Sequence, residues 1–171
     1  MIILVRHAMP VVDPATDPAT WPLSPADTAA AATLAQRIPP RAVLVSSDER
    51  KALATLVAAA GSRPVAADPR LREVVRPRAQ AGEDVRRAYV AACRAPAGWE
   101  PHHDVAARLD AAVDAHRVAG RPLVLAGHGM AFTVWLAARG LVADPAAFWA
   151  DLGFPDLLAL DDTGLHRPPP G

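Results

Sequence analysis

Short apolar runs alternate with helical patterns along this chain of 171 residues, and this alternation constrains the fold more than any other feature. Apolar runs rich in β-branched residues predict buried strands, and the alanine-rich segments between them predict helices. Such alternation is typical of an α/β sandwich with three layers around a mostly parallel sheet. We expect strands over 2–6, 42–46, 64–67, 122–126 and 157–160, the last at an edge, and helices over 25–38, 48–60, 83–95, 102–118 and 130–139.

The segments between these elements predict loops rather than domain boundaries. Residues 10–25 are rich in proline, and Ser24-Pro25 predicts an N-cap followed by a proline at the first helical position. Residues 69–82 are rich in arginine and proline and show no periodicity. Because neither a repeat nor a linker interrupts the pattern, we expect one domain over 1–171, with a disordered tail over 167–171.

Polar residues follow three of the predicted buried strands at the point where each strand ends. Arg6-His7 follows the first strand, the stretch 46–50 follows the second, and Gly127-His128-Gly129 follows the fourth. The carboxyl ends of parallel strands meet at one rim of a sheet, and ligands bind outside that rim. The sequence therefore predicts that two histidines and two arginines, Arg6 and Arg50, converge there.

This set of side chains suits the transfer of a phosphoryl group. Arginine offers a planar fork that matches phosphate oxygens, and a neutral imidazole can attack phosphorus and carry the group covalently. Arg6, Arg50 and a donating His128 would stabilise the charge on the transferred group. The sequence has neither a carboxylate cluster for magnesium nor a Walker-type loop, so we expect no metal and no cofactor.

Three motifs in this order resemble the histidine phosphatase superfamily, the phosphoglycerate-mutase-like proteins. They are V-R-H-A at 5–8, S-S-D-E-R-K-A-L-A-T at 46–55 and G-H-G at 127–129. The resemblance covers residues 2–160 and implies a phosphoglycerate-mutase-like fold. It also implies that His7 is the phosphoryl acceptor and that Arg6, Arg50 and His128 form the phosphate pocket.

The resemblance also suggests a general acid. A leaving alkoxide needs a proton, and the family often supplies it from an L-x-E segment after the third strand. Leu71-Arg72-Glu73 matches that segment, so Glu73 is the candidate. The following residues, V-V-R-P-R-A-Q, depart from the glycine and W-E-G element of many members, in the segment where those members carry a substrate lid.

Each candidate has a structural alternative. His7 alone would be a satisfied core histidine, and Glu73 alone would be a loop glutamate paired with Arg72 or Arg76. Arg50 begins a helix, where a cation meets the dipole unfavourably, and this favours a ligand role for it. Asp48 and Glu49 enrich the same first turn, as the dipole prefers, and need no further role.

Composition limits the partners. Eighteen basic and eighteen acidic side chains cancel, so nothing indicates nucleic acid or a membrane surface as a partner. Lys51 is the single lysine beside seventeen arginines, which indicates a compositional bias of the coding genome.

One cysteine excludes an internal disulfide. The first residues lack a signal-peptide pattern and no apolar run is long enough to span a membrane, so we expect a cytoplasmic protein.

These observations predict a metal-independent phosphatase that forms a phosphohistidine on His7. We expect its substrate to be a small-molecule phosphate ester or a phosphorylated protein side chain. The short, arginine-rich segment 69–100 favours an open pocket, and hence hydrolysis over mutase activity. A phospho-ligand binding module with little turnover and a metal-dependent hydrolase remain alternatives, and either a monomer or a homodimer is compatible with the sequence.

Overall fold

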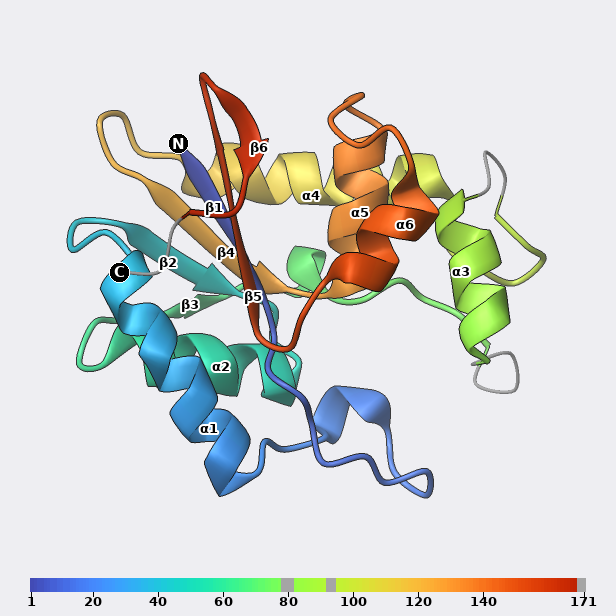
Figure 1. Ribbon diagram of the computed structural model, residues 1–171, viewed down its shortest axis with the longest axis horizontal. Coiled ribbons are helices and arrows are strands. Elements are labelled where there is room, and N and C mark those ends of the chain that lie inside the picture. Colours follow the sequence, from blue (N-terminus) through green and yellow to red (C-terminus); the bar gives the residue numbers. More distant parts are fainter. Residues whose placement is uncertain (78–81, 92–94, 169–171) are drawn as a thin grey trace.

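The computed structural model describes residues 1–77, 82–91 and 95–168. Its centre is a six-stranded sheet with the order β3-β2-β4-β1-β5-β6 (Figure 1). The first four strands of that order run parallel, and β5 and β6 are antiparallel to their neighbours. The strands are β1 (Ile2–Arg6), β2 (Val43–Ser46), β3 (Ala66–Ala67), β4 (Leu123–Gly127), β5 (Asp156–Asp161) and β6 (Gly164–His166).

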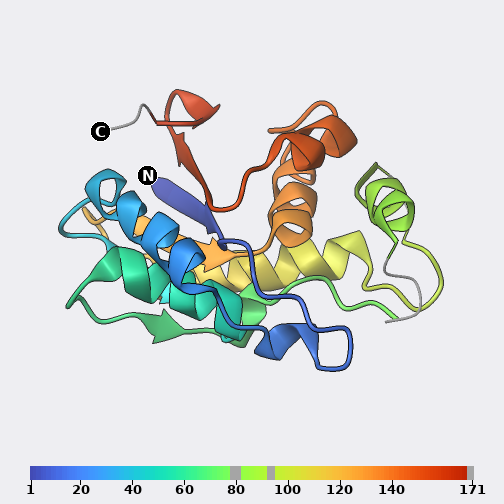
Figure 2. The same cartoon turned by 60° about the horizontal axis from the view of Figure 1, so that its bottom comes forward.

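Helices cover both faces of the sheet, which confirms the predicted three-layer α/β sandwich. Alternate residues of β1 enter opposite cores: Leu4 packs with the helices after β3, and Val5 packs with the helices around β2. One face carries α1 (Pro25–Ala32) and α2 (Arg50–Ala60), which lie side by side in Figure 2. The other face carries α3 (Glu83–Ala91), α4 (His102–His116), α5 (Gly129–Ala137) and α6 (Pro145–Asp151).

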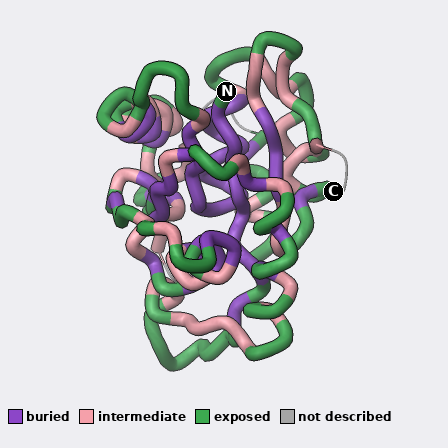
Figure 3. Tube along the Cα trace, turned by 90° about the vertical axis from the view of Figure 1, so that its left-hand side faces the viewer, coloured by how far each residue is buried: buried purple, intermediate pink, exposed green. Residues whose placement is uncertain are grey.

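The central strands of the sheet are buried, and buried residues fill the middle of the molecule in Figure 3, whereas β3 and β6 at the edges have no buried residue. Every residue of β1 and β4 is buried, as expected for parallel strands covered on both faces. Three short 3₁₀ turns complete the described elements: η1 (Pro18–Thr20), η2 (Thr33–Arg37), which continues α1, and η3 (Pro69–Leu71). Within the described ranges, no helix has the length and apolarity that crossing a membrane requires.

The structure differs from the sequence-based expectation mainly near the C-terminus. Strand β5 does not lie at an edge, because it pairs with β1 on one side and with β6 on the other. Helix α6 and strand β6 were not expected. Arg167, predicted to lie in a frayed tail, forms ion pairs with Asp151 and Asp156. The rest of that predicted tail, 169–171, and parts of the expected irregular segment (78–81) and helix (92–94) lie outside the described residues.

Candidate active site

The carboxyl ends of β1, β2 and β4 meet at one rim of the sheet, as the sequence predicts. The register of the parallel ladders pairs Arg6 with Gly127, and Ser46 with Ala126. The residues that follow the strands therefore lie level with one another. His7 and His128 come into contact, with ring centroids 5.1 Å apart in an edge-to-face arrangement.

His7 is held in one tautomer at this rim. Its Nδ1 lies 2.7 Å from the carbonyl oxygen of Ala8. A carbonyl oxygen only accepts hydrogen bonds, so Nδ1 carries the proton and Nε2 keeps its lone pair. The side chain is almost buried, and burial, with the proximity of His128, lowers the pKa of His7 to about 3. The ring is therefore a neutral imidazole near pH 7, which is the nucleophilic form.

His128 is completely buried beside His7. Its Nε2 lies 3.1 Å from the hydroxyl oxygen of Ser47 and 3.5 Å from Oε1 of Glu49. Its Nδ1 has no hydrogen-bond partner among the residues that the structure describes. Burial lowers the pKa of His128 to about 3, and the negative charge of Glu49 opposes that shift.

Arg6 is a buried cation fixed by its surroundings. Its Nη1 donates to the carbonyl oxygen of Leu152 at 2.5 Å, and its guanidinium carbon lies 3.5 Å from the centre of the Phe154 ring. Burial lowers the pKa of Arg6 to about 10, so the group remains charged at neutral pH. Gly129 permits this placement, because a Cβ there would lie 3.0 Å from the Arg6 Nε.

The second cation that lines the cavity is Lys51, and not Arg50, which the sequence predicts as a phosphate ligand. Arg50, the first residue of α2, is exposed and is not part of the cavity lining. Lys51 is buried and lines the cavity. Successive helical residues point about 100° apart, so a shift of one residue turns a side chain from the rim to solvent. The signal that could have found Lys51 is that it is the only lysine in an arginine-rich chain.

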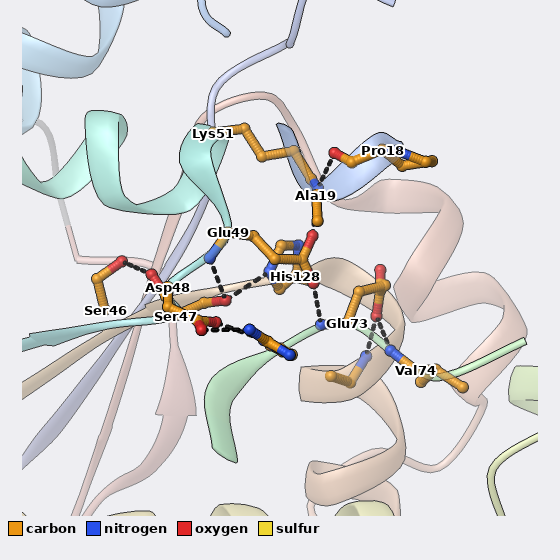
Figure 4. Close-up of polar contacts among 12 residues, drawn as sticks. Pro18, Ala19, Ser46, Ser47, Asp48, Glu49, Lys51, Glu73, Val74 and His128 are labelled. Carbon is orange, nitrogen blue, oxygen red and sulfur yellow. Dashed lines mark hydrogen bonds and ion pairs between the residues drawn. The ribbon is translucent and has the colours of Figure 1, made fainter. Parts of the chain in front are cut away.

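Lys51 is bonded on two sides. Its ammonium group donates to Oε2 of Glu49 at 2.5 Å and to the carbonyl oxygen of Pro18 at 2.9 Å. Pro18 belongs to η1, so this bond links the rim to the proline-rich loop after β1 (Figure 4). An ammonium group has three protons, and its hydrogen bonds to the described residues use two of them, so the third can reach a bound anion.

Glu73 lines the same cavity, and its backbone N–H donates to Glu49, the residue before α2 begins. Oε1 of Glu73 accepts hydrogen bonds from the backbone N–H groups of Val74 (2.9 Å) and Ala131 (3.0 Å), the latter in the first turn of α5. Arg72 pairs with Asp48 instead, and Arg76 donates to the carbonyl oxygen of Val74. Glu73 is therefore not the partner of either neighbouring arginine, and its second oxygen has no hydrogen bond within the described residues.

Glu49 was not expected in the site, because a carboxylate in a first helical turn needs no special role. It is buried, lines the cavity and contacts Lys51, His128 and the backbone N–H of Glu73. Burial opposes its charge, but attraction to His128 and Lys51 and the hydrogen bond from Glu73 hold the pKa of Glu49 down to about 2. Glu49 is therefore an ionised carboxylate within a cationic site.

Arg6, His7, Glu49, Lys51 and Glu73 line one cavity with a volume of about 700 Å³, and His128 contacts His7 but is not among the lining residues. The inner end of the cavity presents His7, Arg6, Lys51, Glu49 and Glu73. Its outer walls are mainly apolar and come from the loop after β1, the segment after η3 and the α5–α6 region. Apolar members include Met9, Pro10, Val12, Trp21, Val74, Val75, Met130, Trp149 and Phe154, and two further arginines, Arg76 and Arg86, join them.

The arrangement supplies a neutral nucleophile, two buried cations and two carboxylates in one cavity. Those are the groups that phosphoryl transfer through a histidine requires. Among the residues that the structure describes, no three His, Cys, Asp or Glu side chains gather as a set that could hold a metal ion.

Comparison with known proteins gives the family. The model of the histidine phosphatase superfamily (branch 1) matches residues 2–156. Since this match spans most of the chain, the protein belongs to that superfamily. None of the curated proteins matches the sequence.

Solved structures agree with this assignment. The native mycobacterial glucosyl-3-phosphoglycerate phosphatase is 28% identical, covers 92% of this chain and 87% of its own, and has a TM-score of 0.63. The complex of that enzyme with inorganic phosphate is 30% identical over 92% of this chain and 88% of its own, with a TM-score of 0.62. A mutant phosphoserine phosphatase from Entamoeba histolytica, bound to phosphoserine, shares the fold at 17% identity, 97% and 93% coverage and a TM-score of 0.66.

Proposed function

We propose that this protein is a metal-independent phosphatase that hydrolyses a phosphomonoester or phosphoramidate through a phosphohistidine on His7. The observation that carries the proposal is the state of His7: a neutral imidazole with its proton on Nδ1, in one cavity with Arg6, Lys51 and Glu73. The similarity to a glucosyl-3-phosphoglycerate phosphatase supports the same reaction class. Arg6 and Lys51 bind the phosphoryl oxygens, and His128 completes this pocket.

The first step breaks the bond from phosphorus to the leaving group. The lone pair on Nε2 of His7 attacks phosphorus, and the bond between phosphorus and the ester oxygen or amide nitrogen breaks. Glu73, in its protonated form, gives its proton to the leaving atom. The charge on the three equatorial oxygens is stabilised by Arg6 and Lys51. The products of this step are the free alcohol or amine, phosphorylated His7 and the Glu73 carboxylate.

The second step restores the enzyme. A water molecule attacks the phosphorus of phosphorylated His7 while the Glu73 carboxylate takes its proton. The bond between phosphorus and Nε2 breaks, inorganic phosphate leaves, and Glu73 is again protonated. Both a small-molecule phosphate ester and a phosphorylated protein side chain remain candidate substrates, because the apolar outer walls of the cavity are compatible with either.

Hydrolysis of p-nitrophenyl phosphate across pH 5–8, with and without EDTA, tests the proposal. We expect turnover that survives EDTA, disappears in His7→Ala and remains in His103→Ala, an exposed histidine of α4 that serves as the control. Turnover abolished by EDTA would instead support a metal-dependent hydrolase. Tight vanadate binding without turnover would identify a phospho-ligand binding module.

A further inference from the structure

Glu49 is the residue of the site that the proposed reaction leaves unexplained. A cavity that binds an anion gains nothing from a carboxylate, since like charges repel. Yet Glu49 is 8% exposed, ionised and positioned among the groups that would meet the phosphate. It also cancels the charge of Lys51, with which it forms a 2.5 Å ion pair.

The two carboxylate oxygens of Glu49 contact different groups (Figure 4). Oε2 accepts from the ammonium group of Lys51. Oε1 accepts from the backbone N–H of Glu73 at 2.8 Å and lies 3.5 Å from Nε2 of His128. The hydrogen-bond partner of Nε2 is the Ser47 hydroxyl at 3.1 Å, which can donate or accept, so the nearby Glu49 charge decides between the two arrangements and favours a proton on Nε2.

This proton position leaves Nδ1 of neutral His128 with a lone pair. That atom is buried and has no partner within the described residues. A lone pair cannot donate to a phosphoryl oxygen, so a neutral His128 in this tautomer gives an anion no hydrogen bond from Nδ1. With a second proton the ring becomes an imidazolium, which donates from both nitrogens.

The charges around His128 make Glu49 the natural counter-ion of that imidazolium. Positive charges face the ring from Lys51 on α2, Arg76 after η3 and Arg108 on α4, and His7 packs against it from the end of β1. Of the two carboxylates of the rim, Glu49 contacts the ring and Glu73 is bonded to Val74 and Ala131 instead. An anion bound beside His7 in the cavity would add a negative charge near the His128 ring, and that charge favours protonation.

We propose that Glu49 is a positioning residue that makes anion binding proton-coupled: when an anion enters, His128 takes up a proton on Nδ1, with Glu49 as its counter-ion. The inference rests on the proposed phosphate site but not on turnover. Without an anion, the charges of the two cations and the two carboxylates of the site nearly cancel. Binding of the anion is then accompanied by binding of one proton to His128. The proton on His128 would also be present when charge develops on the transferred phosphoryl group.

Calorimetric titration with sulfate tests the coupling directly. Sulfate remains a dianion from pH 6 to 8, so any proton taken up on binding goes to the protein. Titrations in two buffers of different ionisation enthalpy give the number of protons. We expect uptake of about one proton by the wild type, with affinity falling about tenfold per pH unit. Glu49→Gln should take up less than half as many protons and show a flatter pH dependence.

Asp48→Asn is the matched control, because it removes the neighbouring negative charge without touching His128. Asp48 pairs with Arg72 at the surface, and we expect this variant to keep the wild-type proton count. Equal uptake in Glu49→Gln and the wild type would overturn the inference, and so would a wild type that binds sulfate without a proton or does not bind it. Absolute affinity is not the readout, since removing a negative charge also strengthens anion binding.

Nitrogen-15 spectra of the histidines in the wild type supply a second test that needs no folded variant of Glu49. Sulfate should convert the Nδ1 resonance of His128, assigned from His128→Asn, from an unprotonated to a protonated shift. If the proton goes to Glu73, that resonance stays unprotonated and the inference fails. Sulfate is not hydrolysed, so loss of the p-nitrophenyl phosphatase activity would refute the proposed function and leave this result standing.

Discussion

The imidazole of His7 donates its Nδ1 proton to the carbonyl oxygen of Ala8, 2.7 Å away. Ala8 is itself fixed, because its N–H donates to the hydroxyl oxygen of Thr55 on α2 at 2.9 Å. Only Nε2 is then free to attack phosphorus. We therefore expect the phosphoenzyme, trapped by rapid quenching, to carry its phosphoryl group on Nε2. Phosphohistidine standards resolve the two isomers, and recovery of the Nδ1 isomer would contradict this geometry.

The two rim histidines make stability depend on pH in a predictable direction. Burial lowers the pKa of both, to about 3, whereas in the unfolded chain each titrates near about 6.5. As pH falls below about 6.5, both histidines bind protons in the unfolded state but stay neutral in the native state, so the free energy of unfolding decreases. We expect the free energy of unfolding to fall by about 1.4 kcal/mol per pH unit for each histidine between pH 6 and 5.

Urea denaturation of the wild type and His128→Asn at several pH values measures this slope. The variant should lose about half of the slope that the two histidines contribute, whatever its stability at pH 7. The exposed His103→Ala variant should retain the full slope. An unchanged slope in His128→Asn would mean that this ring is protonated in the native protein without an anion.

The assignment of Lys51 rather than Arg50 to the anion site can be tested by paired substitutions. Lys51→Met alone would leave Glu49 as an unpaired buried carboxylate, at a cost of about 3–5 kcal/mol. The double variant Glu49→Gln/Lys51→Met avoids this problem. We expect its kcat/KM for p-nitrophenyl phosphate to fall about 100-fold, since a charge-stabilising donor is removed.

Two controls accompany the double variant. Glu49→Gln alone separates the loss of the carboxylate from the loss of the ammonium group. Arg50→Met removes an exposed cation one residue away and should change kcat/KM by less than about threefold. If Arg50→Met lowered kcat/KM more than the double variant does, Arg50 and not Lys51 would be the anion ligand.

The role of Glu73 predicts a dependence on the leaving group. Glu73→Gln keeps an oxygen to accept from the N–H groups of Val74 and Ala131 but has no proton to transfer. An alkyl alkoxide needs that proton, and p-nitrophenolate does not. We expect kcat to fall by about 10²–10⁴ for an alkyl phosphate and far less for p-nitrophenyl phosphate. Equal losses for both substrates would show that Glu73 acts in another way.

The meeting of the strand ends was predictable from the sequence because it needs only local information. Buried apolar runs define β1, β2 and β4, and parallel pairing then brings Arg6, His7 and His128 to one rim. Strand order could not be predicted in the same way, because the apolar pattern of 157–160 does not determine which strands pair with it. The edge position expected for β5 was wrong for that reason, and the three residues of β6 give too short a pattern to detect.

The identity of the second cation and the role of Glu49 depended on information that the sequence does not carry locally. Whether Arg50 or Lys51 faces the rim is decided by the rotational phase of α2, which the motif alone leaves uncertain by one residue. The contact between Glu49 and His128 joins residues far apart in the chain, across the neighbouring strands β2 and β4. The helix dipole explains an acid at the start of α2 equally well without any such contact.

Gly129 gives a way to move Arg6 without changing its charge. A Cβ at this position would lie 3.0 Å from Nε and 3.1 Å from Cζ of Arg6, closer than such contacts normally are. The guanidinium group must then move by a few tenths of an ångström, which disturbs the contacts with Phe154 and Leu152 that fix it. We expect Gly129→Ala to weaken sulfate binding and lower kcat/KM by about tenfold, because small displacements of a positioned group are costly.

Stability should distinguish this effect from a damaged fold. Alanine favours a helix over glycine by about 1 kcal/mol, so the first residue of α5 gains propensity while it crowds Arg6. We expect the midpoint of thermal unfolding to stay close to that of the wild type. Gly153→Ala is the control, since its Cβ would make only an ordinary 3.5 Å contact with the Pro155 carbonyl oxygen. If Gly129→Ala bound sulfate as the wild type does, the position of Arg6 would not limit anion binding.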